Sequence, residues 1–289
     1  MNRFKKVILY LKHHDFLAVT VACVMAVLIT TIGFAVAESP ALTSDVQPNQ
    51  TEQTETVYEK PVIFKNLALE VAVIESLRIT QAELTTDLLE TVTSLQISNC
   101  SDITEWQELN LMPNLEKLTV KNCNVVSFQP FTTLSHLKVL DLSGNQIRDF
   151  SGLSSLTQLE QLNVSGNPIL NLPNLSRMQN LQLLNLDYTN ICDLTFLKNS
   201  SVSELHISYT HLSSFTSLSD CEKLEALYMY GYNFMDLSPL HQLPSFHSIF
   251  LSRGFDHSQV DFMIGRFKSA DKYTKVYLAL KNRGIEVYE

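Results

Sequence analysis

The sequence lacks the short motifs that mark common catalytic and metal sites. Its 289 residues contain no HExxH, no GxSxG, no glycine-rich phosphate loop and no CxxC pair. Asp256, His257 and Ser258 have the residue types of a catalytic triad, but neighbours in sequence rarely reach the geometry that a triad requires. A structural zinc site would need cysteine or histidine pairs at short spacing. We therefore expect no catalytic residues, no cofactor and no metal.

Basic residues are scarce beyond the N-terminus. Before residue 38 the chain carries Arg3, Lys5, Lys6 and Lys12 against Asp15, which leaves 17 basic and 29 acidic residues, a net charge of −12, in the remainder. Nucleic-acid binding depends on a cationic surface that displaces counterions from the phosphates. An acidic body of this kind argues against nucleic acid as a partner.

One long run without charge lies near the N-terminus. Residues 16–37 contain no charged side chain and follow the basic residues 1–15. The run is long enough to cross a membrane as a helix, and its basic flank predicts that residues 1–15 stay in the cytoplasm. A cleaved signal peptide also fits, because Ala35-Val36-Ala37 has the small-x-small pattern of a cleavage site. Either alternative places the rest of the chain outside the cytoplasm.

Residues 38–60 are rich in Thr, Gln, Glu and Pro and contain almost no apolar side chains. Such a segment cannot bury enough surface to fold, so we expect a disordered, flexible linker. If the N-terminal run stays in the membrane, this linker is a stalk that lifts the following domain off its surface.

From Leu115 to Phe250 the sequence repeats almost every 22 residues. Stacking the units aligns two apolar columns, one with Leu118, Leu140, Leu162 and Leu184, the next with Val120, Leu142, Val164 and Leu186. A fixed period of this length is typical of a leucine-rich-repeat solenoid, in which each coil buries its apolar face only against its neighbours.

Each unit predicts one strand, one turn and a short return. Leu118-Thr119-Val120 alternates between core and solvent, and a small, mostly polar residue follows three positions after the second apolar one. Its side chain can bond backbone groups that a sharp turn would leave unpaired. We predict an α/β repeat: a leucine-rich-repeat solenoid of about eight 22-residue coils over residues 92–255, with a parallel concave sheet and turns or 3₁₀ segments on the return side. The expected strand centres are residues 95, 118, 140, 162, 184, 205, 227 and 249.

Two of the five cysteines fall in this turn column. Cys100 and Cys123 each follow an asparagine at the turn. They can be buried thiols that serve in the column or a disulfide between neighbouring coils, and spacing alone does not decide between these alternatives. Cys192 and Cys221 occupy non-equivalent positions of their repeats and do not suggest a pair.

The segments that flank the repeats depart from the period and are expected to cap the array. Residues 61–91 predict a helical N-terminal cap, in which Thr80 to Glu83 resembles a capping box before a second helix. The first helix has an apolar stripe of Leu67, Val71, Ile74 and Leu77. Residues 256–289 predict an α/β C-terminal cap with two helical stripes, the second ended by Gly284 before residues 285–288. An interaction helix is the alternative for this C-terminal segment.

The unit from Leu137 to Leu156 has the pattern Leu-x-x-Leu-x-Leu-x-x-Asn-x-Ile-x-x-Phe-x-x-Leu-x-x-Leu. It resembles the internalin-type repeats of Gram-positive bacterial surface proteins, and residues 64–84 are similar to the cap that opens many of them. The resemblance covers about residues 61–255. It implies a cell-envelope protein that binds another macromolecule through its concave sheet. The C-terminus has no LPxTG-type sorting signal, so we expect any anchoring to come from the N-terminal segment.

Strand alternation identifies the side chains on the concave face. In the first coils they are mostly small and polar, whereas in coils five to eight they are larger. The candidate ligand-binding residues are Asp187, Tyr188, His206, Tyr209, Tyr228, Tyr230, Phe250 and Arg253. Tyr and Arg are enriched at binding hot spots. However, Tyr and Phe also favour strands and can simply stack on adjacent rungs, so both interpretations stay open.

These features predict an extracytoplasmic protein-binding module, active in adhesion or another envelope interaction with an unknown protein or glycan at the cell surface. It would lie in the cell membrane with its repeats outside, or in the envelope or medium if the N-terminal run is cleaved. A structural scaffold subunit of a membrane-bound envelope complex is the first alternative. A cell-wall-active enzyme is the last.

Overall fold

The computed structural model describes residues 62–101, 103, 105–232, 237–250 and 282–288, all within the compact unit Lys60–Glu289. The expected segments 1–15, 16–37 and 38–60 lie outside the described residues, as do Asp256, His257 and Ser258 and the two helices expected after residue 256. In the part of the chain that the structure describes, no helix combines the length and the apolarity needed to span a membrane.

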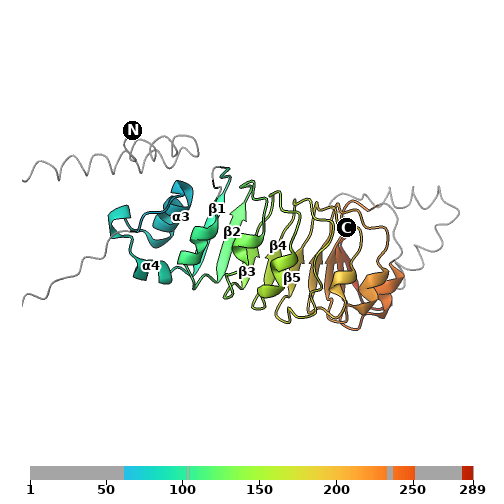
Figure 1. Ribbon diagram of the computed structural model, residues 1–289. Coiled ribbons are helices and arrows are strands. Elements are labelled where there is room, and N and C mark those ends of the chain that lie inside the picture. Colours follow the sequence, from blue (N-terminus) through green and yellow to red (C-terminus); the bar gives the residue numbers. More distant parts are fainter. Residues whose placement is uncertain (1–61, 102, 104, 233–236, 251–281, 289) are drawn as a thin grey trace, which may run out of the picture. The chain divides into compact units, whose positions relative to one another are not determined.

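Nine short strands of the described part form one parallel sheet, ordered from β1 to β9 as in the sequence (Figure 1). The first eight include the eight predicted centres, one for each coil, so the predicted fold and coil count are confirmed. Their bounds are β1 Ser94–Ser98, β2 Lys117–Lys121, β3 Val139–Asp141, β4 Gln161–Asn163, β5 Leu183–Asn185, β6 Glu204–His206, β7 Ala226–Tyr228 and β8 Ser248–Phe250. The ninth strand, β9 Glu286–Tyr288, belongs to the C-terminal cap.

The leucine columns form the core. Leu118 pairs with Leu140, and Leu140 with Leu162, so equivalent residues of successive coils lie side by side. Both predicted columns, from Leu118 to Leu186, have no solvent exposure. Burying one such side chain stabilises the fold by roughly 2 kcal/mol. This repeated burial holds the coils in register.

The two changes in period do not disturb the stack. The step from Leu95 to Leu118 is one residue longer than the period, and the step from Leu184 to Leu205 is one residue shorter, yet both pairs are aligned in the sheet. The extra and missing residues are therefore accommodated in the loops.

Polar side chains bond the turns to one another, as the sequence predicts. The Asn145 side-chain oxygen accepts from the N–H groups of Cys123 and Val125, at 3.0 and 3.1 Å. Its amide group donates to the carbonyls of Val120 and Leu142, at 2.7 and 2.8 Å. One buried amide thus satisfies backbone groups of two coils, which would otherwise be unpaired away from water.

The return side of the described coils contains 3₁₀ segments of three to five residues. They are η2 Gln107–Leu111, η3 Gln129–Phe131, η4 Ser151–Ser155, η5 Thr195–Leu197, η6 Thr216–Asp220 and η7 Ser238–Gln242. Each places a Leu or Phe in the core. A coil of about 22 residues leaves no room here for a longer helix, and 3₁₀ turns are suited to such short connections.

The N-terminal cap contains α3 Leu67–Leu77, η1 Gln81–Glu83 and α4 Thr86–Glu90. Asn66 begins α3 by accepting from the N–H groups of its first turn. The Glu108 carboxylate of η2 accepts from the N–H groups of Lys65 and Asn66, at 2.6 and 3.0 Å, and so ties the start of α3 to the first coil.

The structure adds two details to the predicted cap. The buried face of α3 is Ala68, Leu69, Glu70 and Val73, whereas Leu67, Val71, Ile74 and Leu77 are only half-buried. The small Ala68 lies on the face turned to the coil, and the apolar stripe is rotated away from it. The capping box at Thr80 and Glu83 exists, with Glu83 accepting from the Thr80 N–H at 2.8 Å, but it begins only η1. The next helix, α4, starts at its own N-cap, Thr85.

The described part of the C-terminal cap extends the sheet. Gly284 adopts a left-handed φ of 80° in the turn before β9. Strand β9 then pairs in parallel with β8 and aligns Phe250 with Tyr288. The cap therefore covers the last repeat strand and adds one rung to the sheet.

Cys100 and Cys123 are buried thiols that do not form a disulfide with each other, so the disulfide alternative is wrong. The Cys123 thiol lies 3.0 Å from the Lys121 carbonyl, to which it can donate. Burial raises the pKa of Cys123 to about 11. A thiol that stays protonated at neutral pH is a poor nucleophile, which agrees with a structural role in the turn column.

Candidate binding surface

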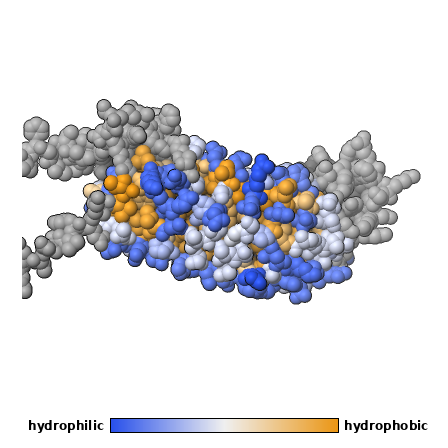
Figure 2. Space-filling model, in the orientation of Figure 1, coloured by the Kyte–Doolittle hydropathy of each residue, from blue (hydrophilic) through white to orange (hydrophobic). Residues whose placement is uncertain are grey.

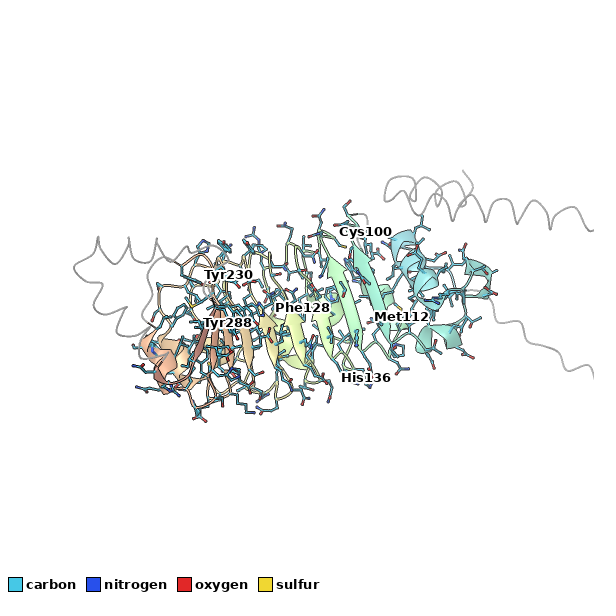
Figure 3. The ribbon with its side chains drawn as sticks, turned by 180° about the vertical axis from the view of Figure 1, so that it is seen from behind. Cys100, Met112, Phe128, His136, Tyr230 and Tyr288 are labelled. Atoms are coloured by element: carbon cyan, nitrogen blue, oxygen red, sulfur yellow. The ribbon has the colours of Figure 1, made fainter. Side chains whose placement is uncertain are left out.

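The predicted binding residues come together on the outer face of the sheet, the face opposite the core. His206, Tyr228 and Phe250 occupy equivalent positions on β6, β7 and β8. Asp187 and Tyr230 follow the ends of β5 and β7 by two residues, and the Asp187 carboxylate lies 4.0 Å from His206 Nδ1. In Figure 3 the label Tyr230 marks this region, which lies toward the opposite end of the sheet from Cys100. The remaining strand candidate, Arg253, lies outside the described residues.

Four rings on adjacent strands form one continuous stack, which we call the ring ladder: His206, Tyr228, Phe250 and Tyr288. Successive ring centroids are 4.0, 4.1 and 4.5 Å apart, with interplanar angles of 7°, 2° and 7°. Neighbouring strands lie about 4.8 Å apart, so the parallel register itself brings equivalent rings to stacking distance. The inner rings, Tyr228 and Phe250, therefore have both faces covered by neighbouring rings.

Tyr288 was missed by the sequence analysis. It comes 38 residues after Phe250, which does not match the 22-residue period. The only signal was the apolar alternation of residues 285–288 after Gly284. If residues 285–288 had been interpreted as a strand that continues the sheet, their alternation would have placed the Tyr288 ring on the outer face.

Tyr188 and Tyr209 lie beside the ladder in a backbone conformation that is rare for large residues. Their φ angles are 57° and 56°, and they lie in the turn after the strand rather than on a strand position. Reading their outward direction from strand register was therefore wrong, although both side chains do reach solvent. In the other described coils the equivalent residues are ones that tolerate this conformation: Asn99, Asn122, Gly144, Gly166 and Gly231.

The left-handed conformation costs a residue with a side chain roughly 1–2 kcal/mol. Tyr188 and Tyr209 remain 63% and 51% exposed, so little burial offsets this cost. The two rings stack on each other at 4.7 Å and 13°. Tyr209 also covers Gly231, where an added Cβ would lie 2.5 Å from its ring. Strained, exposed residues of this kind are typical of binding sites.

A small polar network joins the two sets of rings. Asp187 accepts from the Ser208 N–H at 2.6 Å, and its other oxygen lies 4.0 Å from His206 Nδ1. His206 Nε2 lies 2.8 Å from Glu204. Burial raises the pKa of Asp187, and the Ser208 hydrogen bonds and His206 oppose the increase. Burial, and after it Glu204 and Tyr230, also raise the pKa of Tyr228 above its ordinary value.

The charge of this surface is negative. Asp187, Glu204 and Glu286 lie on the outer face between β5 and β9, and no outward side chain of the described residues there is Lys or Arg. In the first coils, by contrast, Lys121 forms an ion pair with Asp141 at 2.9 Å. We call the C-terminal region the aromatic patch; its residues are Asp187, Tyr188, Glu204, His206, Tyr209, Tyr228, Tyr230, Phe250, Glu286 and Tyr288.

Tyr232 supports the patch from behind, in the turn column that holds Asn145 in an earlier coil. It follows Thr210 by one period, and its hydroxyl contacts Thr210 and donates to the Ile207 carbonyl at 2.7 Å. Burial raises its pKa to about 12. The 22-residue spacing alone could have placed Tyr232 in this column.

The comparison with protein families agrees with this geometry. The family model described as "Leucine rich repeat" matches residues 113–169. The coils described above have the leucine-rich-repeat fold. No curated protein sequence matches it closely enough to be called a relative.

Solved structures extend the similarity of this leucine-rich-repeat protein beyond the matched segment. An internalin (inlF) from Listeria monocytogenes has a TM-score of 0.60 and 24% identity, and the match covers 68% of this chain and 60% of that one. An internalin C2 (inlC2) from the same species has a TM-score of 0.59 and 25% identity, covering 69% of this chain and 92% of that one. The chain thus spans about 60% of the inlF structure. The expected structural resemblance to internalins is confirmed.

Proposed function

We propose that this leucine-rich-repeat protein is an extracytoplasmic recognition module that binds a partner protein through the aromatic patch. The observation that carries the proposal is the pair Tyr188 and Tyr209. Both accept an unfavourable backbone conformation and keep their rings in solvent, where Gly occupies the same turn in neighbouring coils without strain. Stability within the free chain does not account for that choice, whereas contact with a partner does.

The other properties of the patch fit protein recognition. Large aromatic residues that carry a polar group are enriched at binding hot spots, and the stacked ladder holds His206, Tyr228 and Phe250 rigidly in place. Such rigidity lowers the entropy that is lost on binding. The structural resemblance to internalins supports a location at the cell surface or in the medium. Residues 16–37 would either anchor the chain or direct its export.

A capture experiment tests the proposal. The fragment from residue 61 is immobilised and exposed to bacterial and host cell-surface extracts. We expect the Tyr209→Ser, Tyr228→Ser double variant to lose the captured partner while it keeps the circular dichroism spectrum of the folded array. The matched control is Val126→Ser with Leu170→Ser, which removes two exposed apolar side chains outside the patch. Equal capture by both double variants would overturn the proposal.

A scaffold subunit remains the second candidate, because the N-terminal cap has an apolar surface. Half-buried Leu67, Val71, Ile74 and Leu77 lie on α3, and Ile63 is 56% exposed. Figure 2 shows hydrophobic residues at the surface of this end of the described body. If Val71→Ser with Ile74→Ser abolishes capture and the tyrosine variants do not, binding through the cap is the better account.

A further inference from the structure

The tyrosine pair leaves one aromatic face open. Tyr209 lies between the Tyr188 ring and the backbone of Gly231, so both of its faces are in contact. Tyr188 stacks on Tyr209 with one face only, and the stack runs from coil to coil. The other face of Tyr188 is therefore turned toward the preceding coil, whose residue at this turn position is Gly166.

The turn at Gly166 carries no side chain that could cover this face. A Cβ built at Gly166 would meet only backbone atoms of Gly144, at 3.4 Å. One coil earlier in the sequence, the space above Gly144 is occupied, because a Cβ there would lie 1.9 Å from the Asn122 side-chain oxygen. The position above Gly166 thus lies between the coil of Tyr188 and the coil of Gly144, above which the Asn122 side-chain oxygen is placed.

The spacing of the coils limits what fits there. Parallel strands repeat at about 4.8 Å, close to the 4.7 Å between the Tyr188 and Tyr209 rings. A flat group above Gly166 therefore continues the stack by one rung. The neighbouring outward residues, Asn163 and Ser165, are small and polar and are not fully buried, so they leave room for a polar group.

The charge of the surface indicates which flat group is favoured. Asp187 adjoins Tyr188, and Glu204 follows on the next strand. On the side of the open face, the Lys121 ammonium group is held in an ion pair with Asp141 at 2.9 Å. A cation placed on the open face of Tyr188 is attracted both by these carboxylates and by the ring itself. A neutral sugar would gain nothing from the charge.

We propose that the open face of Tyr188, above Gly166, binds an arginine side chain of the partner protein, with the guanidinium group stacked parallel to the ring. Arginine combines the required planarity and positive charge, whereas the lysine ammonium group is compact and strongly hydrated. The Asn122 side-chain oxygen, above Gly144, and the Ser165 hydroxyl, beside Gly166, are the candidate acceptors for the guanidinium N–H groups. The inference rests on the proposed function, because it takes the partner to be a protein.

The test uses defined probes and the full chain. The protein is labelled with 3-fluorotyrosine in a neutral detergent, and the fluorine resonance of Tyr188 is assigned from its loss in Tyr188→Gly. N-acetyl-arginine amide, N-acetyl-lysine amide and methyl β-glucoside are titrated separately. We expect a saturable shift with the arginine probe, about two- to fivefold tighter than with the lysine probe, as an exposed cation–π contact allows.

Two variants sharpen the result. Tyr188→Phe keeps the ring face and should keep arginine binding, observed at the Tyr209 resonance, whereas Tyr188→Gly should abolish it. Ile63→Ser, which removes an exposed apolar side chain on the N-terminal cap and outside the aromatic patch, is the control and should bind normally.

The inference fails if the arginine probe gives no saturable shift, if lysine binds equally well, or if only the glucoside binds, which would indicate a glycan site. If partner capture still depends on Tyr209 and Tyr228 while arginine does not bind, the proposed function stands and this inference alone is wrong.

Discussion

Replacing Tyr188 or Tyr209 with glycine separates binding from stability. Glycine removes the left-handed penalty of roughly 1–2 kcal/mol. Glycine also destabilises the fold by about 0.5–1 kcal/mol, because its backbone loses more entropy on folding. In addition, the variant loses a ring stack worth about 0.5–1.5 kcal/mol at most, because both rings are largely exposed. These contributions nearly cancel. We expect the free energy of unfolding to change by less than about 1 kcal/mol in either direction for each variant.

Equilibrium urea unfolding measures this change, and the capture experiment measures binding on the same preparations. Tyr188→Ser is the informative control, because serine keeps the strained φ of 57° and loses the stack, so it should be less stable than Tyr188→Gly. Gly166→Ala introduces the same strain into the neighbouring turn, at a φ of 65°, and should cost roughly 1–2 kcal/mol. If Tyr188→Gly loses more than about 2 kcal/mol, the ring is a structural element and the argument from strain is refuted.

Three further predictions concern the core and the turns. Asn145→Ala leaves buried backbone groups of two coils unpaired and should lower the free energy of unfolding by about 3 kcal/mol or more. Equilibrium urea unfolding measures this loss. A loss below about 1 kcal/mol would show that the amide is dispensable. Because the pKa of Tyr232 rises from 10.0 to about 12 in the folded chain, its neutral form stabilises the fold fully below pH 10, and that contribution falls between pH 10 and 12. Tyr232→Phe should therefore lose less stability over this interval than the wild type, and equal losses would contradict the cause assigned to the shift. Burial raises the pKa of Cys123 to about 11 and of Cys221 to about 12, so both thiols stay protonated at pH 8 and react slowly. Cys192 is exposed. In a disulfide-exchange assay at pH 8, Cys192→Ser should therefore remove one fast-reacting thiol, whereas serine at Cys123 or Cys221 should remove none.

The sequence predicts the repeat core because the core depends on a simple regularity. Each Leu of the Leu118 column must contact its equivalent in the next coil. The 22-residue period of the sequence and the burial of these side chains therefore have the same cause. This placed all eight repeat strands and the role of Asn145. It also placed the outward rings of His206, Tyr228 and Phe250, whose positions follow from alternation alone.

Features set by tertiary contacts were not predictable in the same way. The conformation of Tyr188 contradicts the intrinsic preference of tyrosine, so no local rule assigns it a left-handed turn. The apolar residues of α3 define a stripe, but its orientation is set by close packing of Ala68 against the coil. Tyr288 joins the ladder through strand pairing across a cap that the repeat period does not reach.

The most direct test of the central claim is site-specific photo-cross-linking in intact cells. A benzophenone amino acid is introduced at Tyr188 or Tyr230 in the aromatic patch, and at Val126, which is 73% exposed outside it. We expect one discrete cross-linked partner from the two patch positions and none from Val126. Cross-links to that partner from Val126 or from Ile63 on the N-terminal cap, with none from the patch, would contradict the account.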